Sequence, residues 1–378
     1  MTDASVAGAL SLYKDAFTEA FRPPWQVARV LGRIVACRSG ALGTHVCECP
    51  ECGTRHEEPN SCRDRHCPRC QKANRAEWLE DRRRELLGAT YYHVVFTLPD
   101  CLNRLALSRM RDVYKALFHA AWGTIDAFGR GAGMRLGATC VLHTWGAAMS
   151  LHPHLHCIVP GGGMDLETGR WKQLPVRVRE NGGQPFLFPV AAMSSKFRGL
   201  YVATLRKLGV EPPKDVADAC FARDWVVYCK SPSCGPEATL EYLSRYVYRV
   251  AITDSRVLSV SDGGVEFAYK DRRDNRSKTM TLDGVEFVRR FSMHILPSGF
   301  FKVRHYGILS PACRKILKEM QLQSGSDVVY NGGRRKEGKR PPRTRVCMVC
   351  GCMVHMSIRW RPPYGARAPD FPPPATAP

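Results

Sequence analysis

The sequence predicts an α+β protein in which helices pack on an antiparallel sheet, preceded by a small helical and cysteine-rich unit. Three observations support this fold class. Residues 91–99 read as a buried strand, and residues 103–128 follow with the apolar spacing of an amphipathic helix. Residues 140–146 and 152–160 then read as two strands whose short connection fits a hairpin. The order strand, helix, strand, strand is typical of a domain with an antiparallel sheet and helices on one face.

The chain has 378 residues, enough for two or three units. We expect a helical lead-in with zinc knuckles at residues 1–88, the main α+β domain at 89–323, and a basic, Cys-containing and Pro-rich tail at 324–378. Neither a secretory signal nor an apolar run of about 18 residues that could span a bilayer is recognisable. The sequence therefore predicts a soluble, cytoplasmic protein without a membrane partner.

Charge and cysteine content narrow the class further. Lys and Arg number 56 against 35 Asp and Glu, a net charge of +21 that favours a polyanionic partner, with nucleic acid as the default. The chain holds 17 cysteines. In a reducing compartment these thiols are expected to be metal ligands or small core residues rather than disulfides.

Two Cys-Pro-x-Cys knuckles are the most specific signal. Cys49 and Cys52 form the first knuckle, Cys67 and Cys70 the second, and fourteen residues separate them. That spacing is close to the one at which two knuckles close a tetrahedral zinc site. We therefore predict one structural zinc held by these four thiolates, which would leave no open position for a substrate.

Other residues near the knuckles have less certain roles. Cys47, Cys62 and His66 are spare or alternate ligands, and the late knuckle Cys347-x-x-Cys350 either completes a second zinc site or is a pair of structural thiols. The cations around the knuckles suggest contact with phosphate. The residues predicted to make that contact are Arg63, Arg65 and Arg69.

Histidines mark the strand at 152–160. Side chains alternate along a strand, so His152, His154 and His156 should project from one face. His143, on the neighbouring strand, could face the same site. Such a cluster can form part of the coordination shell of a divalent metal, while the alternative is a set of polar residues on a half-exposed sheet.

Two tyrosines follow on an expected helix. Tyr242 and Tyr246 are four residues apart and share one helical face, a spacing that is more often core packing than chemistry. Combined with the histidine strand, however, they suggest a reaction. A metal would polarise a phosphodiester and a tyrosine hydroxyl would attack the phosphorus, leaving a 5′-phosphotyrosine and a free 3′-OH. Such an intermediate conserves the bond energy, which suits a chain without a P-loop for ATP.

A later strand alternates aromatic with basic residues. Residues 300–306 contain Phe300, Phe301 and Tyr306 together with Lys302 and Arg304. Bases of single-stranded DNA can stack on such aromatics while the cations follow the phosphates. An ordinary half-buried strand explains the pattern equally well.

Taken together, the motifs resemble the insertion sequence 91 family of transposases in the HUH superfamily, over about residues 10 to 355. The resemblance is carried by residues 61–71, 92–99, 152–163, 242–252 and 296–307. It implies an HUH nuclease-like catalytic domain that cuts and rejoins single-stranded DNA during rolling-circle transposition. The partners would be single-stranded DNA at the ends of a mobile element and target DNA, and a homo-oligomer remains open.

The resemblance also implies roles for single residues. Tyr246 would be the first nucleophile and Tyr242 the second, although some relatives use one tyrosine. His154 and His156 would ligate a catalytic Mg²⁺ or Mn²⁺, beside a structural Zn²⁺ in the knuckles. Related enzymes add a third polar ligand, often four residues after the tyrosine, where this chain has Val250. The candidates to replace it are, in order, His143, His152 and Glu241.

Three alternatives stay open. The same chemistry would serve a rolling-circle replication initiator or a relaxase. A metal-dependent phosphodiesterase that uses water would cleave without a protein adduct. A non-catalytic, zinc-dependent DNA-binding regulator would use its histidines and tyrosines structurally.

Overall fold

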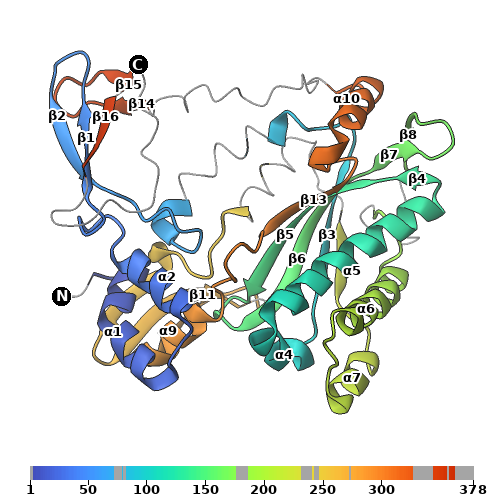
Figure 1. The fold of residues 1–378 in the computed structure, drawn as a ribbon, viewed down its shortest axis with the longest axis horizontal. Coiled ribbons are helices and arrows are strands. Elements are labelled where there is room, and N and C mark those ends of the chain that lie inside the picture. Colours follow the sequence, from blue (N-terminus) through green and yellow to red (C-terminus); the bar gives the residue numbers. More distant parts are fainter. Residues whose placement is uncertain are drawn as a thin grey trace.

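The computed structural model describes residues 3–71, 79, 82–175, 186–230, 241, 247–271, 274–326, 344–355 and 357–361. At its centre is a five-stranded sheet in the order β13-β5-β6-β3-β9, in which every neighbouring pair is antiparallel (Figure 1). Its strands are β3 (Tyr91–Thr97), β5 (Gly137–Trp145), β6 (Leu151–Pro160), β9 (Val227–Lys230) and β13 (Val303–Gly307). The predicted α+β class with an antiparallel sheet is therefore confirmed.

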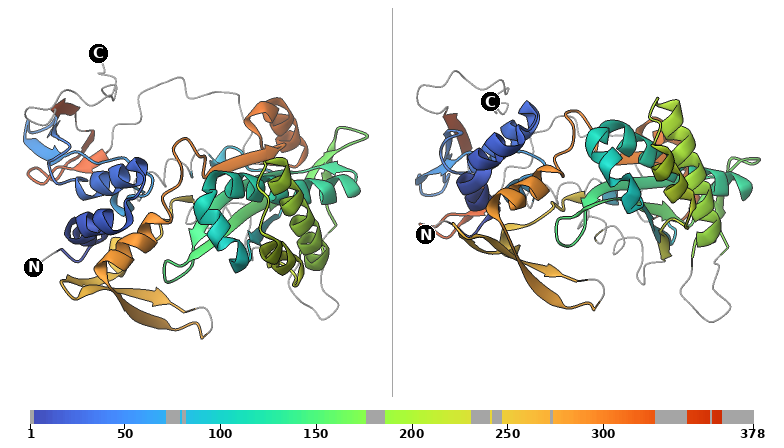
Figure 2. Two further views of the ribbon diagram at one scale, coloured as in Figure 1. Left: turned by 60° about the horizontal axis from the view of Figure 1, so that its bottom comes forward. Right: turned by 90° about the horizontal axis from the view of Figure 1, so that it is seen from below.

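Helices cover one face of this sheet (Figures 1 and 2). They are α4 (Asn103–Ser108), α5 (Met110–Gly131), α6 (Val190–Lys207) and α7 (Lys214–Phe221). Alternate strand residues such as Phe96 and Leu155 pack beneath them with Phe118 and Phe197 in the largest core cluster. The single helix expected at 103–128 is divided at Arg109, whose φ of −126° and ψ of 44° leave the helical region.

A smaller sheet extends the main one and explains the triple glycine after the histidine strand. It contains β4 (Met134–Arg135), β7 (Gly162–Asp165) and β8 (Trp171–Gln173). A Cβ on Gly163 would lie 2.5 Å from the carbonyl oxygen of Arg135, so only glycine allows this close approach. Helix α10 (Arg314–Gln323) follows β13 and contributes Leu317 and Met320 to a third core cluster.

The N-terminal helices share a core with a segment far along the chain. This unit contains α1 (Val6–Phe21), α2 (Trp25–Val35), β10 (Val257–Ser261), β11 (Gly264–Lys270), β12 (Ser277–Leu282) and α9 (Gly284–Ser292). Leu10, Phe17 and Ile34 pack there with Phe267 and Phe287. Figure 1 shows α1 and α9 side by side. The lead-in helices are therefore completed by residues that lie between β9 and β13 of the central sheet in sequence.

An early and a late segment of the chain meet in a third region (Figure 1). Strand β1 (Thr44–Glu48) pairs with β2 (Arg55–Pro59) on one side and with β16 (Ser357–Arg361) on the other, and the hairpin of β14 (Thr344–Val346) and β15 (Met353–His355) lies beside them. Among the helices of the described residues, none has both the length and the apolar character of a membrane span.

Candidate functional site

Three histidines converge on the sheet face opposite the helices. His143 on β5 pairs directly with His154 on β6, and His156 lies two residues further along the same face. Their side chains are buried, and each offers a ring nitrogen such that the three nitrogens lie within 4.8 Å of one another. His152, also expected in this cluster, has its ring centroid 5.1 Å from that of His154 but does not belong to the converging group. The period of two along the strand thus brings together His143, His154 and His156.

Hydrogen bonds orient two of these rings. Nδ1 of His154 lies 2.7 Å from the carbonyl oxygen of His152, which can only accept, so Nδ1 carries the proton and Nε2 is left with its lone pair. Nδ1 of His156 lies 2.8 Å from Nε2 of His93 on β3. Burial, and secondly the charge of Lys230, lower the pKa of His93 to about 4, so this ring is neutral at pH 7. A neutral His93 can accept the proton of His156, an arrangement typical of oriented metal ligands.

The two predicted tyrosines, Tyr242 and Tyr246, lie outside the described residues. Of the flanking residues, Glu241 is exposed, whereas Val247 is buried in a cluster with Val141 and Ile158. Val141 pairs with His156 across β5 and β6, so these side chains share the histidine face of the sheet. The residue that directly follows Tyr246 therefore packs against the face that carries the three histidines.

Four buried cysteines form one cluster in the N-terminal part. Cys37 follows α2, while Cys62, Cys67 and Cys70 lie in the loop and short helical turn that lead away from β2. The Sγ atoms of Cys37 and Cys62 each lie 3.6 Å from that of Cys70. A tetrahedral zinc with Zn–S distances of about 2.3 Å places its sulfurs about 3.8 Å apart, so the spacing fits a zinc site. We call these four residues the inner cluster.

A second cluster is formed by cysteines from two turns that are far apart in sequence. Cys49 and Cys52, in the turn between β1 and β2, meet Cys347 and Cys350, in the turn between β14 and β15. We call these four residues the outer cluster. The expected grouping of Cys49 and Cys52 with Cys67 and Cys70 is thus wrong: each knuckle belongs to a different cluster. Chain spacing restricts which knuckles can meet but does not choose among them, because that choice depends on tertiary packing.

The cations near the knuckles have different surroundings. Arg63 is exposed, with a positive φ of 53°. Arg65 instead donates to the backbone carbonyls of Leu296, Pro297 and Phe300. Its desolvation lowers the pKa of the guanidinium. A guanidinium bonded in this way stabilises the loop before β13, which makes a structural role the simpler explanation of this residue.

The other predicted nucleic-acid contacts are also engaged within the protein. Arg69 forms an ion pair with Asp3 at 3.0 Å. The guanidinium carbon of Arg304 lies 4.2 Å from the ring centre of Phe118, on the helix-covered side of the sheet. Phe300 is buried, so its ring is not available for a base, whereas Phe301 is exposed. The alternation along 300–306 therefore mostly reflects two faces of a packed strand.

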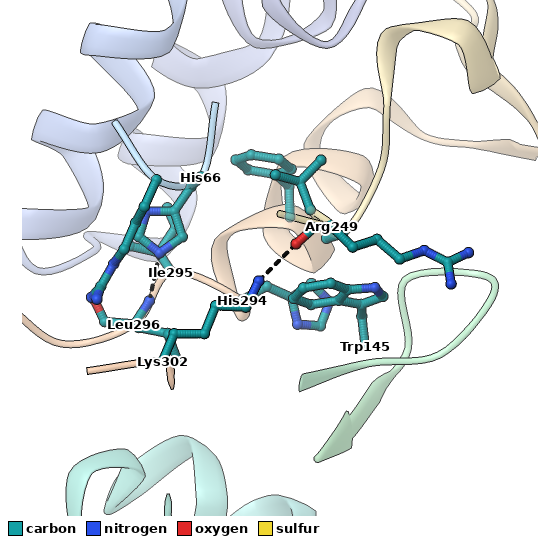
Figure 3. A pocket seen from close by; sticks show the side chains of 11 residues that line it. His66, Trp145, Arg249, His294, Ile295, Leu296 and Lys302 are labelled. Atoms are coloured by element: carbon teal, nitrogen blue, oxygen red, sulfur yellow. Dashed lines mark hydrogen bonds between the residues drawn. The ribbon is translucent and has the colours of Figure 1, made fainter. Parts of the chain in front are cut away.

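A pocket lies beside the histidines (Figure 3). The ring of Trp145 stacks on that of His143, with the ring centroids 4.7 Å apart. Nζ of Lys302 lies over the ring of Trp145, 5.1 Å from its centroid. Lys302 donates to the backbone carbonyl of Arg249 at 2.8 Å, and burial, followed by the charge of Arg65, lowers the pKa of this lysine to about 7. The guanidinium of Arg249 is exposed at the edge of the pocket. These side chains lie next to the histidine face of the sheet through Trp145, which stacks on His143.

Several residues of the site carried weak or no signals in the sequence. Cys37 has no second cysteine nearby, so its spacing did not mark it as a ligand, whereas Cys62, five positions before Cys67, was expected only as a spare or alternate ligand. His93 lies in an apolar strand whose pattern indicated only burial. Its alignment beside His156 follows from the register of β3 against β6, which pairs Val95 with His156.

Comparison with known families gives two matches to this chain. Residues 9–98 match a family model described as a transposase zinc-binding domain, and residues 137–316 match one described as a putative transposase. The first match contains the whole inner cluster together with Cys49 and Cys52. The second contains His143, His154 and His156.

Individual relatives agree with these models. The chain is 42% identical over 307 residues to the putative transposase y4qJ of Sinorhizobium fredii, covering 76% of this chain and 75% of that protein. It is 28% identical over 291 residues to the transposase for insertion sequence element IS801 of Pseudomonas savastanoi pv. phaseolicola, covering 74% and 69%. Among solved structures, the conjugative relaxase TrwC in complex with oriT DNA is matched over 40% of this chain and 68% of that one. That match has 13% sequence identity and a TM-score of 0.17.

Proposed function

The chain belongs to the insertion sequence 91 family of transposases, and on that premise we propose that it cuts and rejoins single-stranded DNA through a covalent 5′-phosphotyrosine intermediate. The observation that carries this proposal is the convergence of the buried side chains of His143, His154 and His156 on one face of a rigid sheet. The protein would act on single-stranded DNA at the ends of a mobile element, because its family is one of transposases.

The three imidazoles would hold a divalent ion, Mg²⁺ or Mn²⁺. Their donor set fits this role because His154 uses Nδ1 as a donor, which leaves the lone pair of Nε2 for a metal, and because His93 can accept from His156. The bound ion would supply Lewis-acid polarisation of the scissile phosphate. His143 would be the third ligand, because this chain has Val250 at the position where related enzymes often have a polar ligand.

Tyr246 is the proposed nucleophile, with Tyr242 as the possible second. The attack forms a bond from the phenolic oxygen to phosphorus and breaks the bond to the 3′-oxygen, which leaves as a hydroxyl while the phenol loses its proton. Attack by a 3′-OH on the phosphotyrosine reverses the step and frees the tyrosine. Support comes from Val247, one peptide bond from Tyr246, which packs on the histidine face.

The remaining chain would hold the DNA strand. Arg249 and Lys302 border the pocket next to Trp145, so they would neutralise phosphates close to the histidines. The aromatic ring of Trp145 offers a surface on which a base can stack. A net charge of +21 adds nonspecific attraction over the whole molecule.

The test is to capture the covalent intermediate. Purified protein is incubated with labelled single-stranded oligonucleotides that span candidate element ends, with Mn²⁺ or Mg²⁺, and adducts are resolved on a denaturing gel. We expect the unsubstituted protein to form an adduct and the His154→Ala protein to form none. The adduct should also be lost in Tyr246→Phe, in Tyr242→Phe or in the double variant. Matched controls are His119→Ala, on the outer side of α5, and Tyr228→Phe, at an exposed position of β9, which should keep the adduct.

Two outcomes would replace the proposal. Cleavage without any adduct would identify a metal-dependent phosphodiesterase that uses water. Binding of cognate DNA ends without cleavage or capture, in protein with its metals loaded, would favour a zinc-dependent DNA-binding regulator. An adduct that forms equally well with His154→Ala would remove the histidines from the mechanism.

A further inference from the structure

We infer that the outer cluster, Cys49, Cys52, Cys347 and Cys350, is a second structural zinc site that joins the turn between β1 and β2 to the turn between β14 and β15 in one zinc-binding unit. The Sγ atoms of Cys49 and Cys350 lie 3.8 Å apart, and those of Cys52 and Cys347 lie 3.7 Å apart. Both distances match the sulfur spacing of about 3.8 Å in a tetrahedral Zn–S₄ site. The site lies partly outside residues 9–98, which match the zinc-binding family model.

The two halves of the outer cluster are the same turn built twice. The N–H of Gly53 donates to the carbonyl of Cys49 at 2.9 Å, and the N–H of Gly351 donates to the carbonyl of Cys347 at 2.8 Å. Both glycines have positive φ, 68° and 72°, which a residue with a side chain rarely adopts. Each turn directs its two thiols toward the other turn. Two facing turns with four converging thiols are a complete ligand set for a closed, structural zinc site.

Sequence distance shows what this site would do. The paired cysteines are 301 and 295 positions apart, and the strand β16 that follows them pairs with β1 over five residues, from Thr44 with Arg361 to Glu48 with Ser357. A metal that joins such distant segments fixes the end of the chain beside the N-terminal strands. The segment expected to be a tail therefore belongs to the zinc-binding unit, and this assignment does not depend on the strand-transfer chemistry.

The two clusters also differ in access to solvent. All four cysteines of the inner cluster are buried, with at most 6% of any residue exposed, and they lie in the core that α1 and α2 share with α9. In the outer cluster, Cys52 and Cys350 are exposed. Chelators and oxidants reach exposed thiolates first. We therefore expect the outer zinc to leave first, with the inner zinc and the helical core intact.

Metal content tests the assignment. Full-length protein is purified under reducing conditions with Zn²⁺, in a His154→Ala background so that the histidine group does not add metal, and zinc is counted by plasma mass spectrometry. We expect two zinc ions per chain, and one after Cys347→Ser with Cys350→Ser. The matched control is Cys101→Ser with Cys220→Ser, because these two Sγ atoms also lie 3.8 Å apart but belong to no group of four among the residues that the structure describes. This control should keep two.

Release kinetics and hydrogen exchange test the order. A chelator should remove one zinc quickly and one slowly, and the quick phase should be missing from the Cys347→Ser/Cys350→Ser protein. After the quick phase, the amides of β1 and β16 should lose protection while those of α1 and α2 keep it. Substitution of Co²⁺ should give a thiolate charge-transfer band whose intensity falls by half in the same variant.

Three results would overturn the inference. The first is a count of one zinc ion per chain in protein that keeps all its cysteines. This count does not depend on whether the Cys347→Ser/Cys350→Ser variant folds. The second is two zinc ions retained without Cys347 and Cys350. The third is a disulfide between Cys49 and Cys350 or between Cys52 and Cys347 under reducing conditions, found by thiol labelling and peptide mapping. None of these results bears on whether DNA is captured by a tyrosine.

Discussion

At the scale of single residues, buried histidines tie the stability of the protein to pH. His294 is buried, and both ring nitrogens have partners: Nε2 donates to the carbonyl of Met149 at 3.0 Å, and Nδ1 accepts from the hydroxyl of Thr144 at 3.1 Å. In this arrangement each nitrogen of the neutral ring has a partner. Burial is the main reason that the pKa of His294 falls to about 4.

The expected consequence is a loss of stability in acid. Above pH 6.5 the ring is neutral in both the folded and the unfolded chain. Below pH 6.5 this histidine is protonated in the unfolded chain but stays neutral in the folded protein, so the free energy of unfolding falls as the pH drops towards 4. A pKa difference of about 2.5 corresponds to roughly 3 kcal/mol from this one residue. Denaturant unfolding at intervals from pH 7 to pH 4 measures it.

The His294→Gln protein is the comparison. It should be less stable than the unsubstituted protein at pH 7, because glutamine does not reproduce both hydrogen bonds, yet its stability should fall less steeply between pH 6.5 and 4. His119→Gln, at an exposed position of α5, should keep the original slope. An unchanged slope in His294→Gln would mean that His294 is not the group that resists protonation.

At the scale of single elements, two glycines allow the close approach of β13 to β5. Gly307 pairs with Gly137 of β5 and has a φ of 58°. A Cβ at this position would lie 1.9 Å from the carbonyl oxygen of Leu136 and 2.8 Å from the ring of Trp122. The backbone therefore has no room for any side chain, and β13 is the strand that leads from Lys302 of the pocket.

We expect Gly307→Ala to lower the free energy of unfolding by well over the 1–2 kcal/mol that a left-handed conformation alone costs a residue with a side chain. The control is Gly169→Ala, since Gly169 has a φ of 67° but open space around its Cβ position. It should show the conformational cost alone. Thermal unfolding of both proteins measures the difference, and equal losses would show that the clash with Leu136 is relieved.

Elements were also where the sequence was most informative, and where its limits are clearest. Alternation along 140–146 and 152–160 predicted two strands, with His152, His154 and His156 on one face and His143 as a candidate for the same site. The structure brings His143, His154 and His156 together and leaves His152 outside that group. Local pattern could not show that Cys37 completes the inner cluster or that Cys347 meets Cys52. Those contacts depend on how segments far apart in the chain pack, and no periodicity records that.

At the scale of the whole molecule, the cores do not follow the order of the chain. The boundary expected at residue 88 passes through a shared core, since α1 and α2 pack against β10, β11, β12 and α9. A Cβ on Gly284 of α9 would lie 2.2 Å from the ring of Tyr13, which shows how closely α9 approaches α1. The N–H of Val6 also donates to the carboxylate of Asp254 at 3.0 Å. In sequence, the other unit therefore comes partly before β3 and partly between β9 and β13 of the central sheet.

A matched pair of substitutions tests this arrangement. Leu10 is fully buried among Phe17 and Phe287, whereas Leu12, two residues later on the same helix, is 38% exposed. We expect Leu10→Ala to cost about 2–5 kcal/mol and Leu12→Ala at most about 0.5 kcal/mol. Hydrogen exchange in Leu10→Ala should rise in α1 and, together with it, in β11 and α9, because one core stabilises all three. Faster exchange confined to residues before 88 would instead support an independent N-terminal domain.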